Sequence, residues 1–326
     1  MSEITLVEAI NKALAYEMAV DPTVVVLGED VGRNGGVFRA TVGLHSRFGE
    51  TRVRDTPLSE TLIAGMAIGM AAEGLKPIVE IQFMGFIYPA IDQILNHATR
   101  LRTRTRGRLT CPLVVRSPHG GGIHAPEHHS ESTESMFAHI PGLRVVIPSS
   151  PARAYGLLLA AIRDRDPVLF LEPTRLYRLV RQEVEDNGEA LPLDSCFVLR
   201  EGTDVTLVSW GAMLHECLTV ADKLANEGVS AEVIDCATLK PLDMPAILES
   251  VAKTGRCVIV HEAAKTCGIG AEITAQLAER GLLTLLAPVQ RVTGFDTVMP
   301  LPRLEKYYLP GIERIIKAVY QTLEFA

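Results

Sequence analysis

The sequence lacks the features that identify several large classes of protein. None of its six cysteines belongs to a CxxC pair. Scattered cysteines of this kind are typical of free thiols in a reducing compartment. Its apolar runs are too short or too rich in glycine to cross a bilayer, and the N-terminal residues have the pattern of an amphipathic helix rather than a signal peptide. We therefore expect a cytoplasmic protein that does not enter a membrane.

Positive charge and aromatic side chains are also scarce. The formal net charge is −7, and only 5% of the residues are aromatic. This composition argues against a general nucleic-acid surface and predicts an aliphatic core. The arginine-rich stretch 100–108 is the local exception. It is either a solvated helix end or a contact for a partner or a phosphate group, and the sequence favours neither interpretation.

Nucleotide-binding and zinc-protease motifs are missing as well. No GxGxxG follows the first predicted strand, and no GxxxxGK[ST] occurs. The segment CGIGAE, Cys267–Glu272, opens a helix but is only a weak signal for anion binding. The histidine-rich loop 119–132 has no HEXXH order, which disfavours zinc. Acid–base catalysis or phosphate contact suits its histidines better, and incidental histidines on a solvated loop remain an alternative.

What the sequence does contain is a regular alternation of strand and helix signals. The alternation predicts an α/β protein with two domains, each a mainly parallel sheet flanked by helices. We expect the first domain over residues 1–180, a polar linker over 181–200 and a smaller second domain over 201–326. The first helix is expected at Leu6–Val20, where Thr5 and Glu8 form a capping box. Another is expected at Tyr88–Arg102.

One stretch, Arg54–Gly74, combines an acid with a run of small apolar residues. A helix that is apolar on all sides is expected to be buried on all sides. Glu60 would stand at the start of that buried helix, where a carboxylate is either paired or used in chemistry. The simpler alternative is that Glu60 only interacts favourably with the helix dipole. That interaction stabilises the helix by less than about 1 kcal/mol.

Several segments together resemble a known family. They are GEDVG (28–32), DTPLSE (55–60), EIQFMGFIYPAIDQI (80–94), EHHSES (127–132), HIPGLRVVIPSSP (139–151), RDRDPVLFLEP (163–173), TLKPLD (238–243), VHEA (260–263), CGIGAEI (267–273) and GFDT (294–297). In this order they resemble the beta subunit of thiamine diphosphate-dependent 2-oxo acid dehydrogenases. The resemblance covers nearly the whole chain and implies a transketolase-like pyrimidine-binding domain followed by a transketolase C-terminal-like domain.

The resemblance assigns roles to individual residues. Glu60 matches the acid that hydrogen-bonds a ring nitrogen of the cofactor's aminopyrimidine, and Phe86 matches the aromatic that stacks on that ring. His129 matches the histidine that assists acyl transfer to a lipoyl arm. Glu29 and Leu58 are implied as further residues of the cofactor pocket.

The family also carries a structural potassium ion in this subunit. The resemblance places its ligands at Leu113, Ala161, Ile162, Asp164 and Asp166. Carbonyl and carboxylate oxygens suit such a hard cation. An Asp-rich turn before Pro167 with no ion is the alternative interpretation.

The absence of one motif indicates a partner subunit. In this family a GDG…N motif on the alpha subunit holds the diphosphate and Mg²⁺, and no GDG occurs here. The resemblance therefore implies an active site shared with an alpha subunit, in a heterotetramer of two alpha and two beta chains. It also implies docking to a lipoyl acyltransferase core.

The implied activity is oxidative decarboxylation of a small 2-oxo acid, with acyl transfer to lipoyl-lysine, the acceptor being a disulfide. The appearance of EHHSESTES and SPHGGGIHAP favours pyruvate. Branched-chain 2-oxo acids and acetoin remain alternatives, as does a self-contained transketolase-type enzyme, which the missing GDG disfavours. A scaffold without catalytic residues is the non-enzymatic alternative.

Overall fold

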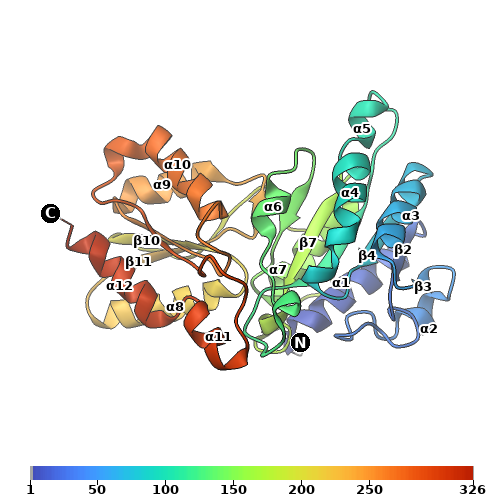
Figure 1. The fold of residues 1–326 in the computed structure, drawn as a ribbon, viewed down its shortest axis with the longest axis horizontal. Coiled ribbons are helices and arrows are strands. Elements are labelled where there is room, and N and C mark those ends of the chain that lie inside the picture. The colour runs from blue at the N-terminus through green and yellow to red at the C-terminus, as the bar shows by residue number, and fades with distance from the viewer. Residues whose placement is uncertain (1–2, 326) are drawn as a thin grey trace. The chain divides into compact units, whose positions relative to one another are not determined.

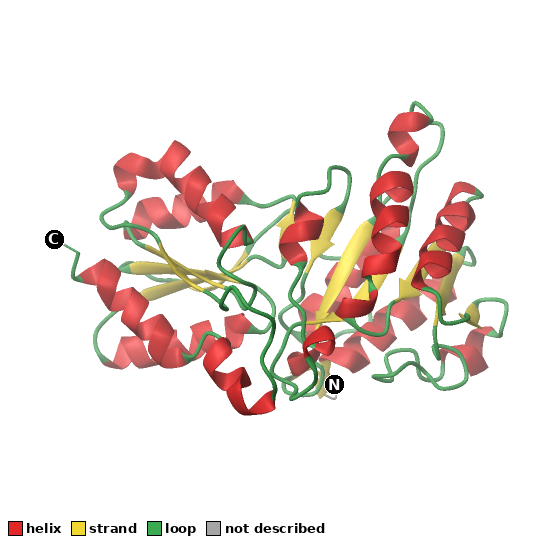
Figure 2. Ribbon diagram, in the orientation of Figure 1, coloured by secondary structure: helices red, strands yellow, loops and turns green. Residues whose placement is uncertain are grey.

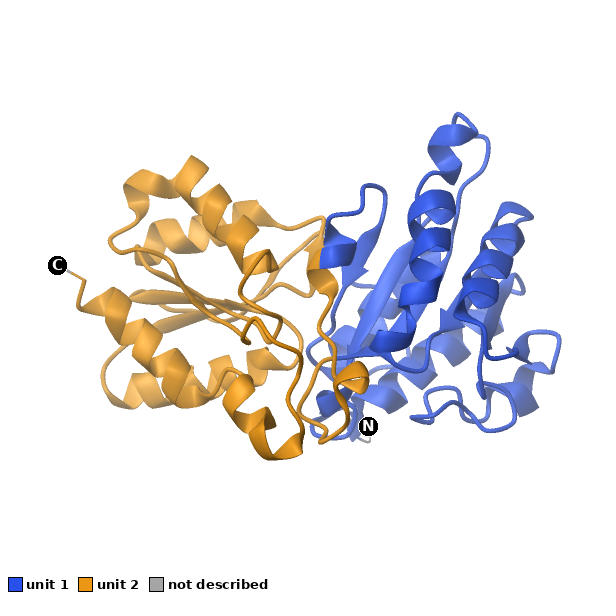
Figure 3. Ribbon diagram, in the orientation of Figure 1, with its two compact units in different colours: residues 1–119, 136–193 blue, residues 120–135, 194–326 orange. Residues whose placement is uncertain are grey.

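The chain packs into two compact units, which Figure 3 distinguishes by colour. The computed structural model describes residues 3–325. Unit 1 comprises the described residues up to His119 together with Met136–Leu193, and unit 2 comprises Gly120–Ser135 together with the residues from Asp194 onward. The segment 120–135 thus interrupts unit 1 along the chain and belongs to unit 2 by its contacts.

Unit 1 is built on a parallel sheet. Its strands lie in the order β6-β7-β5-β4-β2-β3. Their bounds are β2 (Val24–Gly28), β3 (Val53–Asp55), β4 (Lys76–Glu80), β5 (Val114–His119), β6 (Arg144–Val146) and β7 (Val168–Pro173). Most of their residues are buried, as in a sheet with both faces covered. Because the strands are parallel, their carboxyl ends meet at one edge, where such sheets place ligands.

The helices of unit 1 follow from local sequence signals. They are α1 (Leu6–Val20), α2 (Leu44–Phe48), α3 (Glu60–Ala72), α4 (Ile91–Gln93), α5 (Leu101–Arg104) and α7 (Pro151–Arg163), while α6 (Glu134–Ala138) begins at the end of the segment 120–135. The predicted capping box of α1 is confirmed, with Thr5 N–H donating to Glu8 Oε2 over 2.7 Å. A small antiparallel pair joins β1 (Glu3–Thr5) to β8 (Arg181–Glu183).

The expectation that α3 is buried on all sides is wrong for this chain. Ile63, Ala64 and Ala67 are buried, whereas Leu62 is 47% exposed. The buried positions recur with the three-to-four-residue spacing of one helix face, and α3 packs that face near β4. Segment 88–98 also packs against α3, whereas Leu62 and Gly69 are exposed in the described chain.

The single helix expected at Tyr88–Arg102 is also wrong, because the segment is broken into short pieces. A 3₁₀ turn at Tyr88–Ala90 leads into α4, then a π-helical turn at Ile94–Ala98, then α5 (Figure 1). Thr99 N–H donates to the Ile94 carbonyl over 3.1 Å, which is the wide ring of a π turn. Sequence periodicity does not register an inserted residue of this kind.

Unit 2 is a second sheet with helices on both faces. The sheet order is β14-β13-β10-β11-β9, parallel except for the antiparallel edge strand β9. The elements are β9 (Phe197–Arg200), β10 (Val205–Ser209), α8 (Met213–Asn226), β11 (Ala231–Asp235), β12 (Thr238–Lys240), α9 (Met244–Thr254), β13 (Cys257–Val260), α10 (Ile269–Gly281), β14 (Gln290–Val292), α11 (Pro302–Tyr308) and α12 (Ile312–Leu323). Helices α9 and α10 cover one face and α8 and α12 the other (Figure 2).

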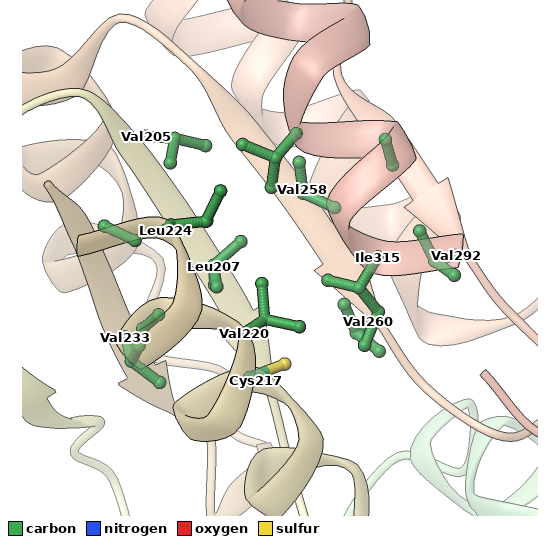
Figure 4. Close-up of a cluster of buried hydrophobic side chains, with 14 of the residues drawn as sticks. Val205, Leu207, Cys217, Val220, Leu224, Val233, Val258, Val260, Val292 and Ile315 are labelled. Carbon is green, nitrogen blue, oxygen red and sulfur yellow. The ribbon is translucent and has the colours of Figure 1, made fainter. Parts of the chain in front are cut away.

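The core of unit 2 is aliphatic, as the composition predicts. Leu207 and Val258 from the sheet meet Val220 of α8 and Ile315 of α12, and all four side chains are fully buried (Figure 4). At about 25 cal/mol per Å² of apolar surface, each such side chain stabilises the fold by roughly 1.5–3 kcal/mol. Among residues 3–325, no helix is both long and apolar enough to cross a membrane.

Candidate active site

Two carboxylates lie close together where the strands of unit 1 end. Glu29 follows β2, and Glu60 is the half-buried first residue of α3. Burial raises the pKa of Glu29, the negative charges of Glu60 and Asp30 raise it further, and the Ser59 N–H partly opposes them. Glu29 Oε1 is buried and has no hydrogen-bond partner among the described residues. This edge of the sheet can therefore hold a proton that a bound base could share.

Aromatic rings follow this edge of unit 1. Phe86 lies in the 3₁₀ turn Met84–Phe86, with its ring centroid 5.8 Å from that of Phe83 in an edge-to-face contact. Phe83 in turn contacts Phe38 at 5.4 Å, and Phe38 contacts Tyr177 at 5.0 Å. The sequence singled out Phe86 alone. Phe83 lies in the same segment, whereas Phe38 and Tyr177 come from distant segments that only the fold brings to it.

Beneath these rings lies a buried ion-pair network that sequence reasoning missed. Arg116 of β5 donates from Nη1 to Glu80 Oε2 over 3.0 Å and from Nε to Glu172 Oε1 over 2.6 Å. Tyr177 O–H donates to Glu172 Oε2 over 2.6 Å. Burial raises the pKa of Glu80 while Arg116 opposes that shift, and the two carboxylates raise the pKa of Arg116 despite its burial. The parallel register, which places Glu80 beside Arg116, is the only signal for this contact.

In unit 2, His129 ends the 3₁₀ turn Glu127–His129. Its ring centroid lies 4.2 Å from that of His128. Burial and the neighbouring His128 lower the pKa of His129, and Glu127 opposes them. This shift favours the neutral imidazole, which is the form that accepts a proton.

Two buried carboxylates that the sequence did not indicate fix the start of this loop. Gly121 N–H donates to Glu262 Oε2 over 2.9 Å, and Gly122 N–H donates to Glu305 Oε1 over 2.7 Å. A Cβ at Gly120, whose φ is +82°, would lie 2.5 Å from Glu262 Oε1. Glycine is required there both for its backbone conformation and for this close approach.

The remaining predicted site residues occupy two places in unit 1. Leu58 precedes α3 with 82% of its side chain exposed. The residues proposed for potassium lie at the end of α7 and next to the start of β5, where Val168 N–H donates to the Leu113 carbonyl over 2.9 Å and Asp164 N–H to the Ala161 carbonyl over 3.3 Å. Asp164 also pairs with Arg144, and Asp166 with Arg102, each over 2.7 Å. Ile162 is buried in the last turn of α7.

Over the described part of the chain, no three His, Cys, Asp or Glu side chains converge as metal ligands. The arginine-rich stretch contains α5, and Arg102 and Arg104 use their guanidinium groups in contacts within unit 1. Glu60 belongs to unit 1 and His129 to unit 2.

Known proteins resemble this chain along its whole length. Residues 2–180 match the family described as transketolase, pyrimidine binding domain, and residues 195–315 match transketolase, C-terminal domain. The chain is 48% identical, over 100% of both chains, to the pyruvate dehydrogenase E1 component subunit beta of Bacillus subtilis (strain 168). It is 50% identical to that of Acholeplasma laidlawii, over 97% of this chain and 96% of the relative.

The chain belongs to the pyruvate dehydrogenase E1 beta-subunit family. The resemblance inferred from the sequence segments is thereby confirmed. Membership of this family implies thiamine diphosphate dependence and an alpha-subunit partner. A solved structure titled split gene transketolase, inactive beta4 tetramer, shares the fold with a TM-score of 0.82 at 24% identity, over 99% of each chain.

Proposed function

We propose that the chain is the catalytic beta subunit of a pyruvate dehydrogenase E1 component. In this proposal it acts with an alpha subunit to decarboxylate pyruvate oxidatively and to pass the acetyl group to a lipoyl group, whose disulfide is the acceptor. The observation that carries the proposal is the pair Glu29 and Glu60, which holds a buried acceptor oxygen at the carboxyl edge of the sheet. Full-length similarity to E1 beta subunits supports the choice of reaction.

The residues of unit 1 fit one half of thiamine diphosphate. Glu60 would accept a hydrogen bond from a protonated ring nitrogen of the aminopyrimidine, and Phe86 would stack on the face of that ring. Glu29 would add a second carboxylate beside Glu60. Leu58 would contact the cofactor from the exposed side of the pocket. When bound, the cofactor supplies a carbon nucleophile that stabilises the charge left by decarboxylation. The task of Glu60 is to hold the proton that activates this carbon.

His129 would serve the second half of the reaction. A neutral imidazole can accept or deliver a proton as the lipoyl disulfide opens to a thiol. The lowered pKa of His129 supports this role, because it keeps the ring in the neutral form. The mobile partner in that step is the lipoyl arm of an acyltransferase core.

Two features support assembly with other chains in a heterotetramer of two alpha and two beta subunits. The uncovered face of α3 is apolar, and a cavity of about 330 Å³ next to it is lined by Gly65, Ile68 and Gln93 among others. In unit 2, Leu283 is 100% exposed and Leu286 59% exposed. We propose that the alpha subunit covers α3, as suits an apolar surface of this kind, and supplies the diphosphate and Mg²⁺ ligands that this sequence lacks. Unit 2 would pair with its copy and help to dock the core.

We also propose a potassium ion near the end of α7. The carbonyls of Leu113, Ala161 and Ile162 and the carboxylates of Asp164 and Asp166 would be its hard oxygen ligands. The ion would stabilise the turn between α7 and β7, where Asp166 N–H already donates to Asp164 Oδ1 over 2.9 Å.

The preferred 2-oxo acid is tested directly with purified protein. Decarboxylation of pyruvate and of 2-oxoisovalerate is measured with thiamine diphosphate and Mg²⁺, using this chain alone and with its alpha subunit. We expect activity only in the pair, with pyruvate preferred. Preference for 2-oxoisovalerate would support the branched-chain alternative instead, and activity of the isolated chain would contradict the shared site. One methylene is worth roughly 1–3 kcal/mol of discrimination, so a clear preference is measurable.

A further inference from the structure

Two cysteines of unit 2 that the proposed reaction does not use lie against one another. The Sγ atoms of Cys196 and Cys236 are 3.4 Å apart, and both are free thiols. Cys196 directly precedes the edge strand β9, and Cys236 directly follows β11. Cys236 is fully buried, whereas Cys196 is half-buried and accessible to a small reagent.

The strand register independently places these residues opposite each other. Asp235 pairs with Phe197 in the antiparallel ladder, so the next pair along is Cys236 with Cys196. Cys236 N–H donates to the Ser209 carbonyl over 2.8 Å, and Cys196 N–H donates to Asp243 Oδ2 over 2.9 Å. Neither amide bonds the opposite cysteine, so both thiols are free to face each other. Their Sγ atoms, 3.4 Å apart, need only a short approach to reach the disulfide bond length of about 2.05 Å.

The local environment separates the roles of the two thiols. The contact with Cys196, together with burial, raises the pKa of Cys236 well above that of an ordinary thiol. Cys236 is therefore held as a thiol that an oxidant in solution does not reach. The Asp243 carbonyl also lies 3.8 Å from Cys196 Sγ, so the Cys196 side chain is held in place beside its partner.

We propose that Cys196 and Cys236 form a reversible disulfide when the protein meets a hydroperoxide. In the first step the Cys196 thiolate attacks a peroxide oxygen: the S–O bond forms, the O–O bond breaks, and the leaving oxygen takes up the proton that the Cys196 thiol had released and departs as an alcohol or water. In the second step Cys236 sulfur attacks the Cys196 sulfenic acid: the S–S bond forms, the S–O bond breaks, and hydroxide leaves with the Cys236 proton as water. Two thiols are oxidised and one peroxide is reduced.

The bond would close a loop that contains β9, β10, α8 and β11, and would fix the edge strand β9 to the sheet at the point where the chain enters unit 2. A crosslink of this kind restricts the unfolded chain. It would also keep β9, the edge strand of the sheet, from detaching. The proposal does not depend on the pyruvate dehydrogenase reaction, because it concerns thiols that no step of that reaction uses.

The test uses the full chain treated with hydrogen peroxide, quenched with catalase, and alkylated after unfolding. Tryptic peptides 182–200 and 224–253 separate the two cysteines. We expect these peptides joined, with a mass about 2 Da below their sum, and released by dithiothreitol. Cys267→Ser is the matched control, since Cys267 is an exposed thiol elsewhere in unit 2, and it should leave the crosslink unchanged.

Cys236→Ser gives a second, independent readout. Without its partner, the Cys196 sulfenic acid should persist and be trapped by dimedone several-fold more than in the native chain. The proposal is overturned if Cys196 and Cys236 both stay alkylatable while Cys267 is oxidised. It is overturned equally if the native chain and Cys236→Ser trap the same amount of dimedone.

Discussion

Arg116 of β5 donates two parallel hydrogen bonds to the carboxylate of Glu172 of β7, from Nε to Oε1 over 2.6 Å and from Nη2 to Oε2 over 3.1 Å. Both side chains are 1% exposed, and Nη1 of the same guanidinium reaches Glu80 on β4. The network thus ties three neighbouring strands together beneath the edge that carries Glu29 and Glu60. It fixes the strand ends from which the proposed cofactor site is built.

Replacing Arg116 by Met should destabilise the protein strongly. The change leaves two buried carboxylates without their cation, which costs about 3–5 kcal/mol of unfolding free energy in comparable pairs. Arg102→Met is the matched control, because the Arg102–Asp166 pair is 39% and 41% exposed, and exposed pairs are worth at most about 1 kcal/mol. Urea unfolding measures both values. Equal losses in the two variants would contradict a special role for the buried network.

Glu60→Gln should abolish most of the activity of the complex with its alpha subunit. The amide keeps the size of the side chain but cannot stabilise a shared proton, and loss of such a group typically lowers kcat by about 10²–10⁴-fold. Glu272→Gln changes an exposed acid in the first turn of α10 and should leave activity intact. If Glu60 only satisfied the helix dipole, both variants would keep full activity and lose less than about 1 kcal/mol of stability.

His129→Ala should separate the two halves of the reaction. Acyl transfer to lipoyl groups should fall by about 10²-fold or more, while decarboxylation measured with an artificial electron acceptor should fall much less. His128→Ala, which removes the neighbouring ring, is the control and should affect acyl transfer only weakly. Equal losses in both assays for His129→Ala would assign that residue to binding or folding instead.

The pH dependence of acyl transfer follows from the same histidine. Because burial lowers the pKa of His129, its neutral form persists below pH 6.5. Acyl transfer should therefore hold its rate as the pH falls through the ordinary histidine pKa, and decline only at a lower pH. A decline centred at or above about pH 6.5 would mean that another group limits the step.

The stability of unit 2 should depend on pH through His261. Its ring is 0% exposed and stacks on Trp210, with centroids 5.2 Å apart, and burial lowers its pKa although Glu134 opposes the shift. Below about pH 6.5 the unfolded chain binds a proton at this residue that the folded chain excludes. Folding stability is therefore lost as the pH falls from about 6.5 toward the lowered pKa, at up to roughly 1.4 kcal/mol per pH unit.

The variant His261→Gln isolates this contribution. Its urea-unfolding free energy should vary less steeply than that of the native chain below about pH 6.5. His215→Gln, which replaces an exposed histidine of α8, should retain the native slope. If the unfolding free energy of His261→Gln depended on pH as steeply as that of the native chain, other groups would be responsible for the loss of stability in acid.

Much of the fold was predictable because its signals are local. The predicted helix Leu6–Val20 agrees with α1 residue for residue, since caps and apolar periodicity act within a few residues. The strand runs rich in Val and Ile likewise predicted two mainly parallel sheets. The broken segment 88–104 was missed because a π turn depends on one added residue, which leaves the average composition unchanged.

The sequence by itself determined the family, the two α/β units and the candidates Glu60, Phe86 and His129, because these rest on residue identity and order along the chain. Only the tertiary structure decided which side chains share an environment. The contact of Arg116 with Glu172, the charge of Glu60 beside Glu29, and the meeting of Cys196 with Cys236 all join residues from separate segments. Strand order and register bring such residues together, and the burial that shifts their pKa values exists only once the sheets have packed.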